Sequence, residues 1–359
     1  FVRQAAESGV DVFRVFDSLN WVENMRVAMD AVLKSGKILE ASLCYTGNLT
    51  SSEKTKYDID YYLDMARALK KAGTHIIGVK DMAGLLRPEA AKVLFPALKE
   101  EIGLPIHFHT HDTSGVSAAT IIAASESGVD IIDLAMDAFS GGTSQPCMGS
   151  VLSVLEGTKR QSSLNTSKVR QINDYWEQVR LQYHDFESGL ASPASEVYLH
   201  QMPGGQFTNL KSQARSLGLE DRWQAVANSY AEVNAMFGDI VKVTPSSKVV
   251  GDMALMMVAQ DLTRADVENP DIDINFPTSV VEMLRGDLGQ PPGGFPEKIV
   301  RKVLKNEKPD LSRPGSRLAQ ADMNKIKSEA TTECSNEDLS DEEINSYLSE
   351  FKFPSDEAK

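Results

Sequence analysis

The sequence is poor in cysteine, has no long hydrophobic run and carries no excess of positive charge. Its three cysteines, Cys44, Cys147 and Cys334, lie far apart in 359 residues, so they form neither a disulfide framework nor a zinc ribbon, and a reducing compartment is expected. No stretch approaches the roughly 20 consecutive apolar residues of a membrane helix. The formal net charge of −14 disfavours sequence-independent binding to nucleic acid, which requires a basic surface. We therefore expect neither a membrane nor a nucleic acid as a partner.

The first residues also lack two familiar features. The chain starts at Phe1 without an initiator methionine, and no signal or transit segment follows it. With 42% hydrophobic and 25% charged residues, the composition is that of a globular protein with a large core. We therefore expect this sequence to be a fragment of a longer protein.

One pattern recurs through the first half of the chain: a small residue with glycine, a short apolar run, then polar residues. It occurs at 8–20, 35–47, 72–84, 102–112 and 127–138, and the stretches between have helical spacing. Such alternation is typical of βα units in a parallel sheet, in either a doubly wound sheet or a barrel. Polar residues that could share one rim follow the strands: Asp17, Thr46, Lys80, His111 and Asp137. Because barrel enzymes build their sites there, we favour an α/β fold, a (β/α)8 TIM barrel without three N-terminal units.

The chain is expected to contain three regions. Residues 1–160 hold the five C-terminal βα units of the barrel. Between 161 and 305 the alternation stops and long helical patterns dominate, which predicts an all-helical domain. Beyond Asn306 there are 13 acidic and 7 basic side chains, so 306–359 is predicted to be an acidic linker, partly disordered, with a short terminal helix.

The densest chemical signal is the segment His107-Phe108-His109-Thr110-His111-Asp112 at the end of a strand. Successive side chains of a strand alternate between its faces, so the three histidines project to one side. Two imidazoles at positions i and i+2 can bind a single metal ion. Neutral imidazole suits zinc, manganese or cobalt, and the pattern does not choose among them.

Lys80 closes the apolar strand Ile76-Ile77-Gly78-Val79-Lys80. Burial lowers the pKa of an amine, and a neutral amine can react with CO₂ to form a carbamate. That anionic product could bind the same metal ion as the histidines. The alternative interpretation is a lysine at the rim paired with a neighbouring acid such as Asp81.

A third segment, Val243-Thr244-Pro245-Ser246-Ser247-Lys248, precedes a helical stretch. Its hydroxyl groups could simply cap that helix. The segments Met202-Pro203-Gly204-Gly205 and 291–294 are typical of turns. No P-loop or Rossmann fingerprint is present, and Cys147 has no persuasive base partner for nucleophilic catalysis.

Five segments taken together resemble the carboxyltransferase domain of the pyruvate carboxylase family. They are FRVFDSLN (13–20), VKDMAGLL (79–86), HTHDTSG (109–115), MPGGQFTNL (202–210) and VTPSSKVVGD (243–252). The resemblance runs in order from Phe1 to about Leu304. It implies an eight-stranded barrel followed by a helical funnel, which at 161–305 completes the active site.

The resemblance also implies roles for individual residues. Lys80 would be carboxylated and would share a divalent metal ion with His109 and His111, whereas His107 would not be a ligand. Thr244 matches a threonine that passes a proton between pyruvate and biotin, and Ser247 lies where the family contacts biotin. The family's remaining aspartate ligand, and the arginine and glutamine that hold pyruvate, belong to segments upstream of this sequence.

Cofactors and partners follow from the same resemblance. It implies biotin-dependent carboxylation of pyruvate to oxaloacetate, with biotin on a separate biotinyl domain and ATP and bicarbonate used by a biotin carboxylase domain. A homo-oligomer is implied, dimeric through the carboxyltransferase domain and tetrameric overall, cytoplasmic in bacteria or in the mitochondrial matrix in animals. This sequence alone is expected to be inactive.

Two other functions remain open at this point. A related oxaloacetate decarboxylase α subunit or a transcarboxylase uses a similar lysine strand and histidine pair. A scaffold that has lost catalysis could keep the barrel without the chemistry. If oxaloacetate production depends on ATP and bicarbonate, the protein is not a decarboxylase or a transcarboxylase. A bound divalent ion that is lost on Lys80→Ala would exclude the scaffold.

Overall fold

The structure is a computed structural model of the chain. It describes residues 1–52, 55–187, 189–190, 192–305 and 307–319, and after them residues 322, 324–326, 328, 329 and 332. Cys334 and most of the expected terminal helix lie outside the described residues.

Five parallel strands form one sheet in the order β1-β2-β3-β4-β5. They are β1 (Val12–Val15), β2 (Ile38–Cys44), β3 (Ile76–Asp81), β4 (Ile106–Thr110) and β5 (Ile131–Ile132). Each strand pairs with the next one in the sequence, whereas a doubly wound sheet reverses its strand order at a switch point. The sequential order is that of consecutive units of a (β/α)8 barrel.

Helices separate the strands and make up about half of the remaining described chain. The first group is α1 (Val2–Glu7), α2 (Val22–Lys34), α3 (Ile59–Lys71), α4 (Pro88–Ile102), α5 (Ser117–Glu126), α6 (Met148–Leu155) and α7 (Thr166–Gln182). The second group is α8 (Val197–His200), α9 (Gly204–Ser216), α10 (Trp223–Met236), α11 (Ser246–Ala259), α12 (Arg264–Glu268), α13 (Thr278–Arg285) and α14 (Glu297–Leu304). Within the described part of the chain, none of these helices combines the length and hydrophobicity needed to cross a membrane.

Local sequence signals explain where these helices begin and end. The Asp58 carboxylate accepts a hydrogen bond from the Tyr61 amide and caps α3. Pro88 opens α4, where its missing N–H costs nothing, and Gly103 ends that helix at φ 65°. Each of these helices ends a few residues before the next strand, as the repeated pattern in the sequence predicts.

The two faces of the sheet differ in chemistry because side chains alternate along each strand. One face is apolar and packs on the helices: the ring of Phe108 in β4 lies 5.1 Å from that of Phe95 in α4, edge to face. The opposite face carries charged and polar side chains on four neighbouring strands: Arg14, Glu40, Lys80, His107 and His109. The registers pair Arg14 with Glu40 and Lys80 with His109, so these groups are neighbours across the sheet.

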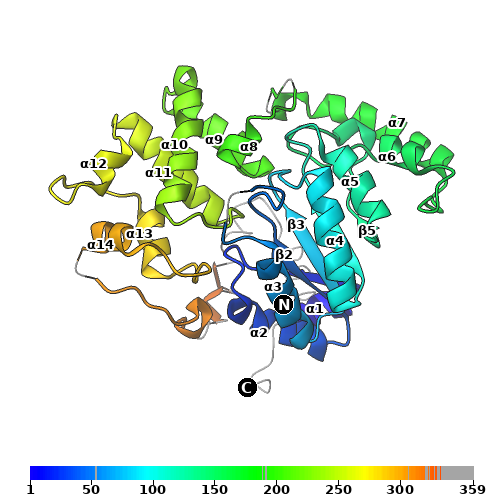
Figure 1. Cartoon of the computed structure of the whole chain (residues 1–359), viewed down its shortest axis with the longest axis horizontal. Coiled ribbons are helices and arrows are strands. Elements are labelled where there is room, and N and C mark those ends of the chain that lie inside the picture. The colour runs from blue at the N-terminus through cyan, green and yellow to red at the C-terminus, as the bar shows by residue number, and fades with distance from the viewer. Residues whose placement is uncertain are drawn as a thin grey trace.

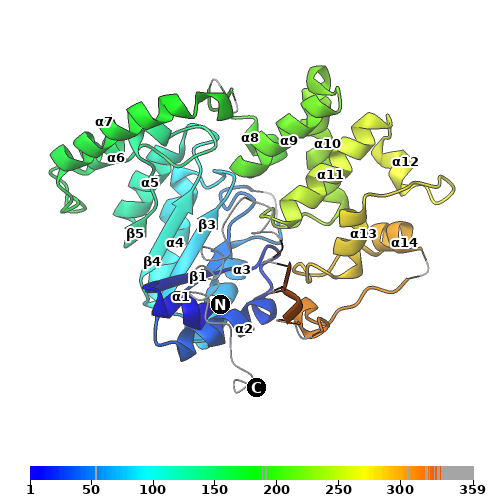
Figure 2. The same cartoon turned by 180° about the vertical axis from the view of Figure 1, so that it is seen from behind.

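Most of the second group of helices lies on one side of the sheet, and α6 and α7 lie on the opposite side (Figures 1 and 2). Helices α9–α14 share a separate apolar cluster that includes Tyr230, Met253 and Met283. Among the hydrogen bonds that join this half to the sheet half are three at the strand ends: Gly204 N to Met82 O at 2.9 Å, Ser246 Oγ to Ser18 O at 3.2 Å, and Lys242 Nζ to Thr46 Oγ1 at 3.3 Å. The three acceptors lie just beyond β3, β1 and β2, so the helical half covers the carboxyl ends of the strands.

Candidate functional site

The structure brings His109 and His111 together at the carboxyl end of β4. Their Nε2 atoms are 3.3 Å apart, and the two rings meet edge to face. Two nitrogens bound to one tetrahedral zinc ion, each about 2.0–2.1 Å from it, would be separated by about 3.3–3.4 Å. The observed separation therefore fits a shared ion.

Each of these histidines has a partner on its other ring nitrogen. His109 Nδ1 lies 2.8 Å from Asp133 Oδ2, and His111 Nδ1 donates to the carbonyl oxygen of Thr143 at 2.6 Å. Metal-binding histidines characteristically use the second nitrogen in this way, which leaves Nε2 free for the ion. Burial, followed by the charges of His109 and Lys80, lowers the pKa of His111 to about 4, so its imidazole is neutral near pH 7, as metal binding requires.

Lys80 lies next to His109 across the sheet and is 8% exposed. Its Nζ lies 3.9 Å from the centre of the Phe16 ring. Burial lowers the pKa of this amine, with opposing contributions from neighbouring charges. A lowered pKa increases the neutral fraction that can react with CO₂.

The pairing of Lys80 with Asp81 is wrong. Asp81 is fully buried and accepts hydrogen bonds from the Leu85 and Leu86 amides and from Thr110 Oγ1. Among the described residues, no carboxylate lies within ion-pair distance of Lys80. The reason is the alternation along β3, which places the two neighbouring side chains on opposite faces.

His107 shares the polar face with the other histidines but lies in a different environment. Its Nδ1 is 2.9 Å from Glu40 Oε2, and its Nε2 is 2.7 Å from Asp133 Oδ1. Burial opposes protonation, but the hydrogen bonds to Asp133 and Glu40 outweigh it and raise the pKa of His107 to about 8. A protonated imidazole cannot bind a metal ion.

The donor set is compatible with a divalent ion held by His109, His111 and a modified Lys80. Within the described residues, no group of three or more His, Cys, Asp or Glu side chains is arranged to hold a metal ion. A third ligand in this part of the chain would have to come from a residue of another type, and Lys80 is the neighbour of His109 in the register.

Thr244 and Ser247 lie at the start of α11, on the helical half. Pro245 occupies the N-cap position and no side chain caps this helix, so the interpretation of these hydroxyls as helix caps is wrong. Thr244 is exposed, which does not match the dry pocket that a proton relay requires. Ser247 is fully buried, and its Oγ has no hydrogen-bond partner in the described structure.

Several residues of this region were not anticipated from the sequence: Arg14, Glu40, Asp133 and Lys242. Arg14 Nε donates to Glu40 Oε1 at 2.6 Å and Arg14 Nη1 to Asp133 Oδ2 at 3.1 Å. A charged residue within an apolar strand, such as Glu40 in β2, was the available signal. Lys242 is buried at the seam between the two halves and donates to Ile240 O at 3.0 Å.

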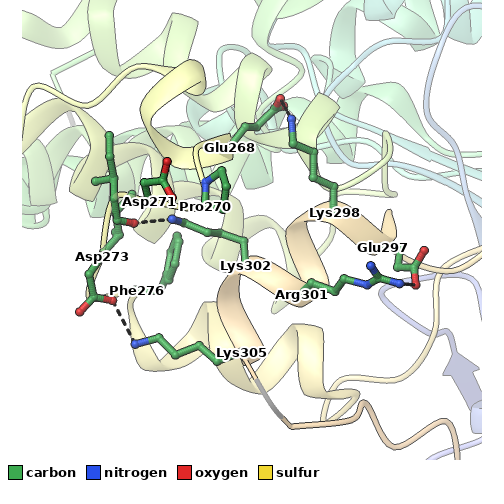
Figure 3. A pocket seen from close by; sticks show the side chains of 12 residues that line it. Glu268, Pro270, Asp271, Asp273, Phe276, Glu297, Lys298, Arg301, Lys302 and Lys305 are labelled. Atoms are coloured by element: carbon green, nitrogen blue, oxygen red, sulfur yellow. Dashed lines mark hydrogen bonds and ion pairs between the residues drawn. The ribbon is translucent and has the colours of Figure 1, made fainter.

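A separate cavity of about 630 Å³ lies between α14 and residues 268–276 (Figure 3). All four of its cationic side chains already have partners. Lys298 pairs with Glu268, Arg301 with Glu297 and Lys305 with Asp273, while Lys302 donates to backbone carbonyls. Among its described lining residues, the cavity therefore holds no group of converging unpaired side chains, and the histidine site is the better candidate.

Comparison with known proteins identifies the family of the chain. Residues 5–175 match the family model described as HMGL-like, and 197–357 match the one described as a conserved carboxylase domain. The chain is 51% identical over 347 residues to pyruvate carboxylase of Bacillus subtilis, covering 97% of this chain and 30% of that protein. Human pyruvate carboxylase, mitochondrial, is 44% identical over 332 residues, covering 92% of this chain and 28% of that protein.

Solved structures extend the comparison to the fold. The carboxyl transferase domain of Rhizobium etli pyruvate carboxylase, with pyruvate and biocytin, superposes with a TM-score of 0.91 at 62% identity, covering 97% of this chain and 58% of that one. The complete multifunctional pyruvate carboxylase from the same organism superposes with a TM-score of 0.90 at 62% identity, covering 97% of this chain and 34% of that one. The chain thus spans about a third of its full-length relatives.

Fold and site define an HMGL-like parallel α/β domain of the TIM-barrel class, joined to a helical carboxylase domain. This confirms the predicted fold class. The chain belongs to the pyruvate carboxylase family and corresponds to part of its carboxyltransferase domain.

Proposed function

We propose that this chain transfers a carboxyl group from carboxybiotin to pyruvate, giving oxaloacetate. The observation that carries the proposal is the convergence of His109 Nε2 and His111 Nε2, 3.3 Å apart, beside the buried Lys80. The family is one of biotin-dependent ligases. In the whole protein we expect biotin on a biotinyl domain, ATP and bicarbonate used elsewhere, and a homo-oligomer in the cytoplasm or the mitochondrial matrix.

His109, His111 and a carboxylated Lys80 would hold a divalent ion such as zinc, manganese or cobalt. Such an ion supplies stabilisation of the negative charge that develops on the keto oxygen of pyruvate. The chain's own contribution is to orient both imidazoles, through Asp133 and the Thr143 carbonyl. The carbamate of Lys80 would offset part of the positive charge of the ion, leaving a site that still tolerates an anionic substrate.

Thr244 would act as a proton relay. Its hydroxyl is too weak an acid to serve as a free-standing base, so it must give its proton to the ureido nitrogen of biotin as CO₂ leaves and accept one from the pyruvate methyl. The methyl carbon then forms the new bond to CO₂, and oxaloacetate results. Because Thr244 is exposed, this role depends on biotin and pyruvate covering it when they bind.

Ser247 is suited to contact biotin or to orient the relay. Its buried Oγ without a partner is energetically unfavourable, and a bound polar group that reached it would recover a hydrogen bond. Tyr230 fixes the backbone beneath it by donating to Ser247 O at 3.3 Å. This supports a binding role for the start of α11.

Thr244→Ala in the full-length protein tests the relay. Oxaloacetate formation should fall by about 10²–10⁴-fold, while bicarbonate-dependent ATP cleavage continues, because that reaction does not use this threonine. Thr244→Ser keeps a hydroxyl and should retain most of the activity. Near-normal oxaloacetate output from the alanine variant would refute the relay, and output independent of ATP and bicarbonate would favour a decarboxylase or transcarboxylase.

A further inference from the structure

Among the described residues, Asp133 is the one carboxylate that contacts two of the three alternating histidines. It follows β5, and its backbone N–H donates to Phe108 O at 3.1 Å, which fixes the residue against β4. Its Oδ2 lies 2.8 Å from His109 Nδ1, and its Oδ1 lies 2.7 Å from His107 Nε2. Both imidazoles therefore meet the same carboxylate, but through different ring nitrogens.

The two contacts have opposite consequences for metal binding. At His107 the carboxylate occupies Nε2, and Glu40 occupies Nδ1, so neither nitrogen is available to an ion. At His109 the carboxylate takes Nδ1, which leaves the lone pair on Nε2 facing His111 Nε2 at 3.3 Å. In the other tautomer of His109, Nε2 would carry a proton and could not bind a metal ion.

We propose that Asp133 is a positioning residue that selects which histidines bind the metal ion, by withholding His107 and fixing His109 with Nε2 free. The inference rests on the proposed function in taking His109 and His111 as the ligands.

The surroundings of Asp133 keep its carboxylate in place. Arg14 Nη1 donates to Oδ2 at 3.1 Å, and Arg14 is held in turn by Glu40 through Nε at 2.6 Å. Arg14, Glu40 and His107 thus form one charged cluster that holds Asp133 in place beside His109. Within this cluster Glu40 contacts Arg14 and His107, but it is not among the partners of His109.

This difference supplies a matched control. Asp133→Asn weakens the contact to His109, whereas Glu40→Gln disturbs the same cluster and leaves that contact in place. Both are made in the full-length protein, and the affinity for zinc is measured by competition with a chelator. The asparagine variant should bind zinc about 10–100-fold more weakly. Glu40→Gln should change the affinity less than about threefold, because His109 keeps its second partner.

A second readout reports the ligand geometry itself. In cobalt-substituted protein, Asp133→Asn should alter the visible absorption bands, and Glu40→Gln should leave them unchanged. If Asp133→Asn does not fold, as judged by circular dichroism, Asp133→Glu keeps the charge but displaces it and should show an intermediate loss of affinity.

Equal losses of zinc affinity in the two variants would overturn the inference, since the cluster would then be merely structural. Unchanged zinc affinity and an unchanged cobalt spectrum in Asp133→Asn would overturn it as well, without affecting the proposed carboxyl transfer. A wild-type protein that binds no divalent ion would overturn both.

Discussion

The sheet half and the helical half of the molecule bury their polar groups differently. The polar face of the sheet carries charged side chains that pair with one another, among them Glu40, His107 and the nearby Asp133. The helical half has an apolar core, and Lys242, Ser246 and Ser247 are buried where it meets the sheet. In the proposed function the sheet would hold the ion, whereas the helices would supply hydroxyl groups and cover the site. The two contributions come together where the halves meet.

The largest effect is expected where the two halves meet at His111. A Cβ added at Gly204 would lie 2.6 Å from Thr143 O and 2.8 Å from His111 Nδ1, atoms that are hydrogen-bonded to each other. Because the oxygen belongs to the backbone, the helix or the histidine must move. We expect Gly204→Ala to lower the stability by about 1–3 kcal/mol and to weaken zinc binding, as measured by thermal unfolding and chelator competition.

Gly205 is the matched control, since a Cβ there meets nothing within 4 Å. Gly205→Ala should stabilise the protein by up to about 1 kcal/mol and leave zinc binding unchanged. The idea that the helical half presses directly on the metal site would be wrong if both alanine variants bound zinc as the wild type does.

A smaller effect is expected at the second seam contact, Lys242. Burial lowers the pKa of its amine to about 8, although Asp239 opposes the shift. Between pH 8 and about 10.5 the unfolded chain holds a proton that the folded chain has released, so the stability of the wild type rises with pH in this window. Below pH 8 both states are protonated and the cost of burying the charge is fully present.

Lys242→Met removes this titration. The stability of the wild type relative to Lys242→Met should therefore rise by up to about 3 kcal/mol between pH 7 and 10, measured as the difference in unfolding temperature. Lys305→Met, at an exposed lysine, should show no such trend. Parallel pH profiles for wild type and Lys242→Met would contradict a buried, readily deprotonated amine at the seam.

The fold was predictable because its signals are local. Glycine-ended helices and apolar strands recur in five units, and a period of two residues is enough to place His109 and His111 on one face. The predicted domain boundaries at 160 and 305 stay predictions, as does the metal set of Lys80, His109 and His111.

The residues that contact the histidines were harder to predict from the sequence, because the register of the sheet brings them together. Asp133 lies 24 residues from His109 and Glu40 lies 67 from His107, and no spacing rule links such positions. The roles of Thr244 and Ser247 came from resemblance alone. Their different burial depends on how α11 packs against α10, which the sequence pattern does not specify.

The central claim is that Lys80, His109 and His111 jointly hold one divalent ion, and metal analysis of Lys80→Ala tests it most directly. The full-length wild-type protein should contain about one divalent ion per chain, and the variant, folded to the same degree by circular dichroism, should contain close to none, because two neutral imidazoles alone bind an ion weakly. A Lys80→Ala protein that keeps its full complement of metal would contradict the account.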